Sequence, residues 1–432
     1  MKITILVYGS LGDVRPYVAL GAGLKSAGHH VHVAADPYFE SLIQAAGVSF
    51  VPVAGSPVEV FESEAGQVVA DDEAGMLKRF SAYGAFNREM KAHIARNLEE
   101  SWPACRDAEA FLFSFNAFAG YHIAEKLAVP AFAVAIAPFT RTRYMPSINF
   151  RERGLGAGYN LLTHNLTERL FFMPPSSHEI NRWRTDTLGL EPLPRKGFMR
   201  RLAASSTIPV FYSFSPALVP RPADWPAWVH AEGYWFPQPD ADWRPPADLV
   251  QFLESGPTPV FVGFGSMSSR DSAPKAKRKL EMVFEALDRA GQRGIVPITD
   301  GAVPDVEFPS SVFGVSRLPY EWLFPRVSMT VHHGGSGTTA ESARAGVPML
   351  VTPFMWDQPF WGRRVHAARL GPAPIPHGKL NAANLGDAIR SVIDDEPMRV
   401  RARAFGERVR AEDGVGRTVE VIEERLGSWS RT

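Results

Sequence analysis

The chain has 432 residues, of which 45% are hydrophobic, enough for two domains that each bury a core. Lysine plus arginine and aspartate plus glutamate both number 46, so the zero formal net charge gives no reason to expect nucleic acid as a partner. The single cysteine excludes an intrachain disulfide, and no apolar run is long enough for a signal-peptide core or a membrane span. We therefore expect a cytoplasmic protein.

The first half of the chain alternates short apolar runs with stretches of helical spacing. Strands are expected at residues 2–8, 30–35, 48–53, 110–115 and 131–137, with helices in stretches such as 16–27 and 117–127 between them. Such alternation predicts a parallel, doubly wound sheet of the α/β class.

A proline- and tryptophan-rich stretch, residues 216–246, interrupts this alternation. Strands are expected again at residues 259–265, 294–299, 314–318, 327–331 and 347–352. We predict a Rossmann-like domain in residues 1–215, a linker in 216–240 and a second Rossmann-like domain in 241–410. A helix would occupy 411–432.

A glycine-rich turn, HHGGSGTT, follows the expected strand at 327–331 and leads into good helix formers at 340–345. Free N–H groups at a helix start, the helix dipole and small residues form a site for phosphate. The candidate phosphate-binding residues are His332, His333, Gly335, Ser336, Gly337 and Thr338. The alternative is an ordinary strand-to-helix turn in which the glycines only permit tight geometry.

Asp357 and Gln358 lie just past the expected strand at 347–352. Ligands of open α/β sheets bind outside the carboxyl ends of the strands, so this pair and the glycine turn should face one crevice. A carboxylate and an amide suit paired hydroxyls, which indicates a nucleotide sugar. Trp356 and Trp361 flank the pair and either line the sugar pocket or pack in the core.

These segments resemble the donor-binding signature of inverting glycosyltransferases with the GT-B fold. The chain is most similar to the bacterial antibiotic and sterol branch of the UDP-glycosyltransferase superfamily, whose members also read HHGG(S/A)GTT and DQPFW. The segments GSLGDVRPYVALGAGLKSAGHHVHVAAD, GYWF and FVGFGSM fit in the same order. The resemblance implies two Rossmann-like domains facing across a cleft, with the last helix crossing back to the first domain.

Asp13, after the first strand in GSLGD, is the predicted catalytic base. Pro16 is expected in the first turn of the next helix. The alternative is a helix N-cap, worth roughly 1 kcal/mol. The resembled antibiotic and sterol enzymes carry an aspartate here, whereas plant-type relatives use a histidine, which this chain lacks between residues 1 and 28. An apolar setting that raised the pKa of Asp13 would help it take the acceptor proton.

Three other patterns compete for a role. Asp240 and Asp242 have the Asp-x-Asp form of a metal site but lie in the proline-rich linker, so we expect no metal or other cofactor. GSLG lacks the middle glycine of a dinucleotide fingerprint. The histidines at 29, 30 and 32 alternate along an expected strand, so they are solvated or core residues rather than ligands of one metal.

Further donor contacts are predicted at Ser266, Arg317 and Leu318. Ser266 follows the strand at 259–265 and either reaches a phosphate or is a plain turn serine. The resembled family reads the nucleobase near Arg317 and Leu318, often with a stacking tryptophan. In this chain Arg317 occupies that position and Trp322 comes five residues later, so the sequence does not decide whether the donor carries UDP or TDP.

The acceptor side carries no motif. Residues 56–101 and 138–175 are expected to be irregular or weakly periodic, and such loops often carry specificity. Phe61, Phe86, Phe115, Phe139 and Tyr144 are candidates for the wall of a lipophilic pocket, although core burial would also explain them. Arginines within residues 141–173 permit at most peripheral contact with a membrane.

The sequence thus predicts an inverting glycosyltransferase that moves a hexose, glucose from UDP-glucose, to a hydroxyl of a sterol, a polyketide or a similar small molecule. Two alternatives are a TDP-deoxysugar transferase of antibiotic tailoring and a non-catalytic homologue that binds nucleotide. The sequence gives no indication of oligomeric state.

Overall fold

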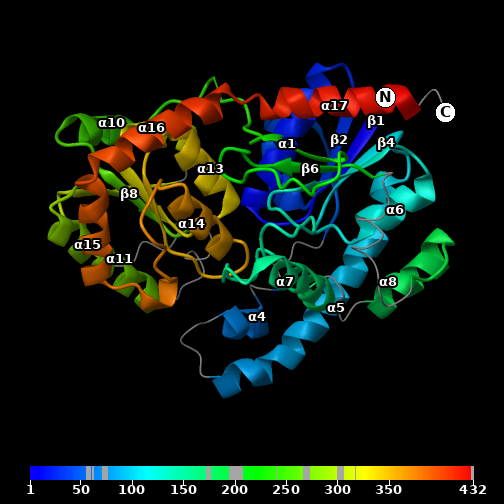
Figure 1. The fold of residues 1–432 in the computed structure, drawn as a ribbon, viewed down its shortest axis with the longest axis horizontal. Helices are drawn as coiled ribbons and strands as arrows, with labels where there is room; N and C mark the ends of the chain where they lie inside the picture. Colours follow the sequence, from blue (N-terminus) through cyan, green and yellow to red (C-terminus); the bar gives the residue numbers. More distant parts are fainter. Residues whose placement is uncertain are drawn as a thin grey trace. The chain divides into compact units, whose positions relative to one another are not determined.

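A computed structural model of the chain describes residues 1–54, 60, 63–70, 76–171, 177–193, 208–239, 241–265, 273–298, 306–316 and 318–429. The chain forms two compact units, each built on its own parallel sheet (Figure 1). The first unit comprises Met1–Pro216, Pro220–Gln238 and Asp413–Thr432, and the second comprises Ala217–Val219 and Pro239–Glu412. The predicted class, two doubly wound α/β domains, is confirmed.

The sheet of the first unit has the order β3-β2-β1-β4-β5-β6-β7, and all pairings are parallel. Its strands are β1 (Lys2–Leu6), β2 (His30–Ala35), β3 (Ser49–Pro52), β4 (Ala110–Ser114), β5 (Ala131–Ala135), β6 (Val210–Ser213) and β7 (Val229–Gly233). Strands β4 and β5 are buried along their whole length, as expected when helices cover both faces. The strand order reverses between β1 and β4, the point at which such sheets bind ligands.

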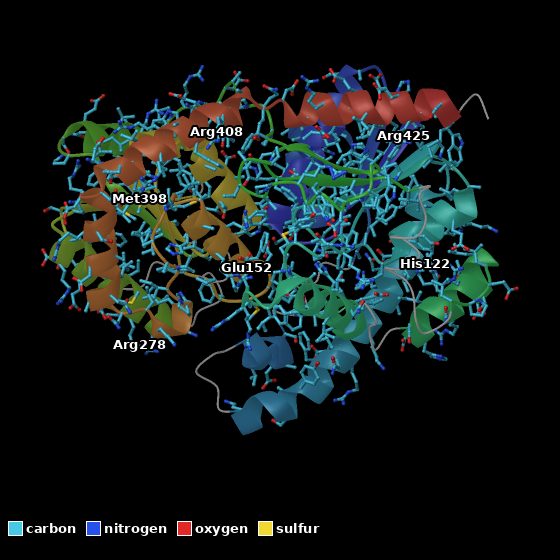
Figure 2. All side chains as sticks on the ribbon, viewed as in Figure 1. His122, Glu152, Arg278, Met398, Arg408 and Arg425 are labelled. Carbon is cyan, nitrogen blue, oxygen red and sulfur yellow. The ribbon has the colours of Figure 1, made fainter. Side chains whose placement is uncertain are left out.

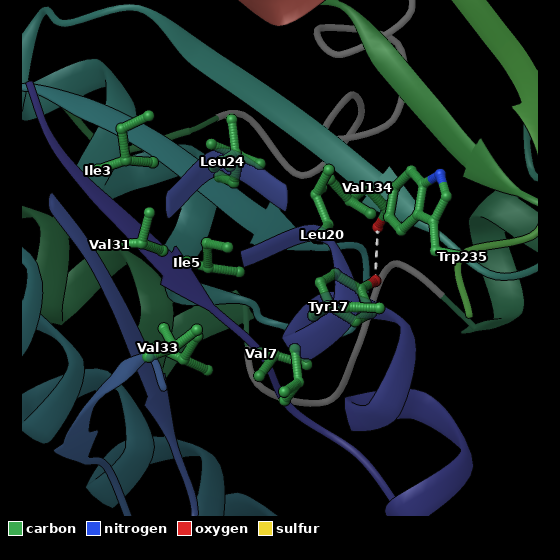
Figure 3. Close-up of a cluster of buried hydrophobic side chains, with 14 of the residues drawn as sticks. Ile3, Ile5, Val7, Tyr17, Leu20, Leu24, Val31, Val33, Val134 and Trp235 are labelled. Carbon is green, nitrogen blue, oxygen red and sulfur yellow. Dashed lines mark hydrogen bonds between the residues drawn. The ribbon is translucent and has the colours of Figure 1, made fainter. Parts of the chain in front are cut away.

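The core of the first unit gathers around β1. Its helical segments are α1 (Leu11–Ser26), η1 (Pro37–Phe39), α2 (Glu40–Ala45), α4 (Glu64–Ala70), α5 (Met76–Cys105), α6 (Ala119–Leu127), α7 (Gly156–Phe171), α8 (Ser177–Trp183), the π-helix η2 (Arg184–Leu188) and α17 (Gly414–Trp429). Figure 3 shows Ile3 and Ile5 of β1 among buried valines of β2 and leucines of α1. This core fixes where β1 ends and α1 begins.

The carboxyl-terminal helix α17 packs against α1 in the first unit (Figure 1). The approach is close, because a Cβ added at Gly23 would lie 2.4 Å from Cγ1 of Val415. Trp235, just after β7, donates from its indole nitrogen to Oγ1 of Thr418 at 3.1 Å. The end of the chain therefore helps to hold the helix that carries Asp13.

The sheet of the second unit has the order β10-β9-β8-β11-β12, again all parallel. Its strands are β8 (Val260–Gly263), β9 (Gly294–Pro297), β10 (Val312–Val315), β11 (Met329–His332) and β12 (Met349–Val351). Its helical segments are α10 (Ala247–Glu254), α11 (Ala273–Ala290), α12 (Tyr320–Leu323), η4 (Phe324–Arg326), α13 (Ser336–Ala345), α14 (Gln358–Ala367), η5 (His377–Lys379), α15 (Ala382–Ile393) and α16 (Glu396–Ala411). Here the strand order reverses between β8 and β11, the strand that leads into the glycine-rich turn.

The structure corrects three expectations. Helix α1 begins at Leu11, so Pro16 lies in its second turn rather than its first. Much of the two stretches expected to be irregular is helical, in α4, α5 and α7. Strands β6 and β7 were not predicted, and β7 lies in the stretch that the sequence assigned to a linker. Each of these strands is short and follows prolines, which masks the strand pattern.

Candidate active site

Asp13 lies at the third position of α1, and Ser10 is the N-cap of that helix. Oδ2 of Asp13 accepts a hydrogen bond from the Ser10 backbone nitrogen at 2.7 Å and another from the Ser10 hydroxyl at 2.8 Å. The cap is therefore Ser10, and Asp13 completes a capping box with it. The role of Ser10 was missed, although the Ser-x-x-Asp spacing before a helix is a known signature of this arrangement.

The carboxylate of Asp13 folds back over Gly9. The φ angle of Gly9 is 147°, and a Cβ at this position would lie 2.6 Å from Cβ, Cγ and Oδ2 of Asp13. A glycine is needed here both for its conformation and for the space it leaves. The turn after β1 is thus shaped around the aspartate side chain.

Desolvation raises the pKa of the half-buried Asp13 carboxyl, while the hydrogen bonds from Ser10 act in the opposite direction. Tyr17 follows one turn later on α1, and its hydroxyl donates to the Val134 carbonyl at 3.0 Å, as Figure 3 shows. Burial and then the charge of Asp13 raise the pKa of Tyr17, so the phenol stays neutral. A carboxylate of raised pKa is a stronger base than an ordinary aspartate.

Two of the predicted acceptor residues come together at the carboxyl edge of this sheet. Phe115 follows β4 and Phe139 follows β5, and their rings stack at 4.9 Å with an interplanar angle of 4°. Beside them, Oγ of Ser114 accepts from the Tyr8 nitrogen at 3.2 Å, which links the end of β4 to the chain leaving β1. An aromatic pair therefore follows β4, the strand next to β1, and β5, the strand after that in the sheet.

The other acceptor candidates lie elsewhere. Phe86 is on α5, where its ring stacks on Tyr83 at 6.4 Å. Tyr144 is 60% exposed in the loop between β5 and α7. Phe61 falls outside the described residues.

In the second unit, His332 ends β11 and holds the glycine turn from within. Its side chain is fully buried, and Nδ1 accepts from the Gly334 nitrogen at 3.0 Å. Burial, reinforced by His333, lowers its pKa to about 3, so the ring is neutral with its proton on Nε2. Nε2 is buried and has no hydrogen-bond partner among the described residues.

His333 lies against the start of α13. A Cβ at Gly335, the N-cap of α13, would lie 2.5 Å from Nε2 of His333, and one at Gly265 would lie 2.5 Å from Cε1. The ring therefore fits between the loop after β8 and the first turn of α13. Burial lowers its pKa to about 4, so it is also neutral.

The first turn of α13 has the features of an anion site. The helix begins at Ser336, and its N-cap, Gly335, makes no side-chain capping hydrogen bond. Gly337 and Thr338 are half-buried. Together with neutral His333, these groups can donate hydrogen bonds to a phosphate without a full positive charge.

Asp357 and Gln358 open helix α14 and also hold their own loop. Oδ2 of Asp357 accepts from the Trp361 indole nitrogen at 2.9 Å. Oε1 of Gln358 accepts from the backbone nitrogens of Phe354 at 2.9 Å and Met355 at 3.4 Å. Because both donors bind the amide oxygen, the amide nitrogen of Gln358 remains to donate to a ligand.

The two tryptophans beside this pair differ. Trp361 is fully buried, so core packing explains it, whereas Trp356 is 57% exposed and has a φ angle of 65°, which is rare for a residue with a side chain. Leu318 packs partly buried beside the core of the second unit. Ser266 and Arg317 fall outside the described residues.

The described residues contain no group of three or more His, Cys, Asp or Glu side chains placed to hold a metal ion. Asp240, the first aspartate of the Asp-x-Asp pattern, falls outside the described residues. None of the described helices is long and apolar enough to cross a membrane.

Two family profiles match the chain. The glycosyltransferase family 28 N-terminal domain covers residues 3–146, and the erythromycin biosynthesis protein CIII-like C-terminal domain covers residues 281–423. The chain belongs to the GT-B glycosyltransferases. The predicted resemblance to the UDP-glycosyltransferase superfamily is thereby confirmed. The first profile covers the segment that carries Asp13, and the second covers the glycine turn.

Comparisons over nearly the whole of this chain agree with this membership. A sterol 3-beta-glucosyltransferase of Aspergillus fumigatus is 34% identical over 98% of this chain, which spans 30% of that relative's length. Two solved structures share the fold. The glycotransferase of kitacinnamycin has a TM-score of 0.68 and 19% identity, with 98% of each chain covered. The glycosyltransferase VinC in complex with dTDP has a TM-score of 0.63 and 19% identity, with 99% of this chain and 100% of that chain covered.

Proposed function

We propose that this GT-B protein is an inverting glycosyltransferase that moves glucose from UDP-glucose to the hydroxyl of a sterol or a similar lipophilic acceptor. The observation that carries the proposal is the Asp13 carboxylate, held through one oxygen and raised in pKa, next to the point where the first sheet reverses its strand order. The similarity to a sterol 3-beta-glucosyltransferase supports the acceptor class.

Asp13 would act as the base. Its Oδ2 is occupied by Ser10, and Oδ1 has no hydrogen-bond partner among the described residues, so Oδ1 is the atom to receive the proton. The acceptor oxygen attacks the anomeric carbon of an α-linked sugar, and the nucleoside diphosphate leaves from the opposite face to give a β-glycoside. Transfer of the proton comes late, as the hydroxyl acidifies in the transition state.

The second unit would bind the donor. The start of α13 and neutral His333 would donate hydrogen bonds to the diphosphate and stabilise its charge as it leaves. Asp357 and the Gln358 amide nitrogen would bind sugar hydroxyls. This mechanism needs no metal, because backbone N–H groups and the helix dipole take the electrostatic role.

Calorimetric titration with UDP, TDP and their glucose conjugates, in the presence of a chelator, tests donor binding. Transfer to cholesterol or ergosterol held in cyclodextrin, with the anomeric configuration of the product read by proton NMR, tests the reaction. An α-linked product would overturn the inverting mechanism. Absence of both binding and transfer would remove the proposed function.

A TDP-deoxysugar donor is the second candidate, favoured by the shared fold with a solved glycosyltransferase that holds dTDP. Tight binding of TDP with weak binding of UDP would select it. The third candidate is a non-catalytic role in which the protein only binds a nucleotide. This role is excluded if the wild type forms product and Asp13→Asn does not.

A further inference from the structure

Helix α7 buries polar side chains and exposes a leucine. Among its described side chains, the buried ones are Thr163, His164 and Thr167, which are 1%, 7% and 4% exposed, whereas Leu161 and Leu166 are only half-buried. Leu162 on the same helix is 54% exposed, and Leu155, just before the helix, is 63% exposed. A helix on the surface of a water-soluble domain normally buries its leucines and exposes its polar residues.

Hydrogen bonds fix α7 in this orientation. Oγ1 of Thr163 accepts from the Ser147 nitrogen at 3.0 Å, and Oγ1 of Thr167 donates to the Ser147 hydroxyl at 2.6 Å. Nε2 of His164 lies 3.2 Å from the Met145 carbonyl oxygen. Specific polar contacts therefore satisfy the inward face, and the exposure of Leu162 follows from how these contacts hold the helix.

The preceding loop presents an aromatic and a basic side chain beside this helix. Asp224 accepts from the Thr142 hydroxyl at 2.5 Å and from the Arg143 nitrogen at 2.8 Å. The next residue, Tyr144, is 60% exposed. Asn160 of α7 donates to the Arg143 carbonyl at 2.9 Å, which joins the loop to the helix.

A second stretch of the loop adds positive charge. The Tyr159 hydroxyl of α7 donates to the Arg151 carbonyl at 2.8 Å, so this stretch also lies against the helix. Arg151 and Arg153 are exposed, and Glu152 between them, labelled in Figure 2, is exposed as well. We call the set of Arg143, Tyr144, Arg151, Arg153, Leu155 and Leu162 the α7 patch.

We propose that the α7 patch docks on an anionic lipid surface. Leu155, Leu162 and Tyr144 would enter the headgroup region, and Arg151 and Arg153 would bind lipid phosphates. The Arg143 side chain is ion-paired with Asp224 at 3.6 Å, so it lies at the edge of the patch. Because the net charge of the chain is zero, attraction to such a surface has to come from a local patch of this kind. The link to catalysis, delivery of a membrane-held acceptor, rests on the proposed function, whereas docking itself does not.

Flotation of the full chain with vesicles tests docking. Wild-type protein is expected to float with phosphatidylcholine vesicles that contain phosphatidylglycerol, and much less with pure phosphatidylcholine. Arg151→Glu/Arg153→Glu is expected to weaken binding about tenfold or more, and Leu155→Ser/Leu162→Ser about tenfold, in both cases without lowering the thermal midpoint. High salt should also reduce binding of the wild type to the anionic vesicles, because it screens the arginine charges.

The matched control is Val400→Ser/Arg403→Glu on α16 of the second unit, where Val400 is 52% exposed and the Arg403 side chain 66%. It is expected to float like the wild type. Failure of the wild type to float, or equal flotation of all variants, would overturn the docking proposal. Transfer to a sterol in cyclodextrin, measured alongside, separates the two ideas: activity there with no flotation removes only the docking proposal, and flotation without activity removes only the proposed function.

Discussion

Ser10 donates both of its hydrogen bonds to a single oxygen of Asp13, from its backbone nitrogen at 2.7 Å and from its hydroxyl at 2.8 Å. This pairing fixes the direction of the carboxylate and leaves its other oxygen for a substrate proton. The same bonds stabilise the charged form and so limit the rise in pKa that desolvation causes. Ser10 therefore influences both the orientation and the basicity of Asp13.

Replacement of Asp13 by asparagine is expected to lower kcat by about 10²–10⁴-fold, because the amide still accepts from Ser10 but takes no proton. Affinity for UDP, measured by calorimetry, should not change. Asp36→Asn is the matched control, since Asp36 caps the short helix η1 by accepting from Tyr38. Full activity of Asp13→Asn would refute the assignment of the base.

The replacement Gly9→Ala is expected to displace the Asp13 carboxylate, because the added Cβ would lie 2.6 Å from it. The positive φ angle adds a backbone cost of about 1–3 kcal/mol, so the thermal midpoint should fall together with kcat. Gly12→Ala is the control, since a Cβ there meets only the Ser10 hydroxyl oxygen, at 3.8 Å. Normal kcat in Gly9→Ala would show that the position of the carboxylate does not limit the reaction.

Strands β1, β8 and β11 were predictable because each is a short, mostly apolar run that leads into a glycine-containing turn, and β4 was predictable from its apolar run alone. Strand β2 was placed residue for residue, whereas β6 and β7 were missed because prolines surround them. The residue types of the site could also be read from the turns. The different roles of His332 and His333 could not be predicted, because they depend on distances that only the fold sets. His332 holds the turn, whereas His333 lies at the start of α13.

This division makes the two histidines distinguishable by mutation. His333→Ala is expected to raise the KM for UDP-glucose and to lower the thermal midpoint less than His332→Ala does. His332→Ala should lower the thermal midpoint, because it leaves the Gly334 N–H without its acceptor and opens a cavity in a fully buried position. Steady-state kinetics and thermal unfolding of both variants check this. The reverse pattern would exchange the two roles.

Stability should fall as the pH drops below about 6.5. Burial lowers the pKa values of His122 and His332 to about 3 and those of His164 and His333 to about 4, so these rings fold in the neutral form. The unfolded chain binds their protons at a pKa of about 6.5, so stability is full above that pH and is lost as the pH falls toward the folded values. The raised pKa of Asp13 opposes this trend, but one carboxyl acts against four histidines. Urea unfolding between pH 4 and pH 8 measures the slope, and a flat profile would contradict the burial of neutral rings.

Gln358 offers a way to separate sugar binding from loop structure. Gln358→Glu keeps the oxygen that accepts from the Phe354 and Met355 nitrogens but loses the amide donor, whereas Gln358→Ala loses both. We expect the glutamate variant to keep the wild-type thermal midpoint and to raise the KM for UDP-glucose about three- to tenfold, the worth of one neutral hydrogen bond. The alanine variant should lose thermal stability as well. UDP without a sugar should bind both the wild type and Gln358→Glu equally, because in the proposed function the missing amide donor binds the hexose. An unchanged KM for UDP-glucose in Gln358→Glu would show that this residue only holds its loop, and the hydroxyl-binding role would then fall to Asp357 alone.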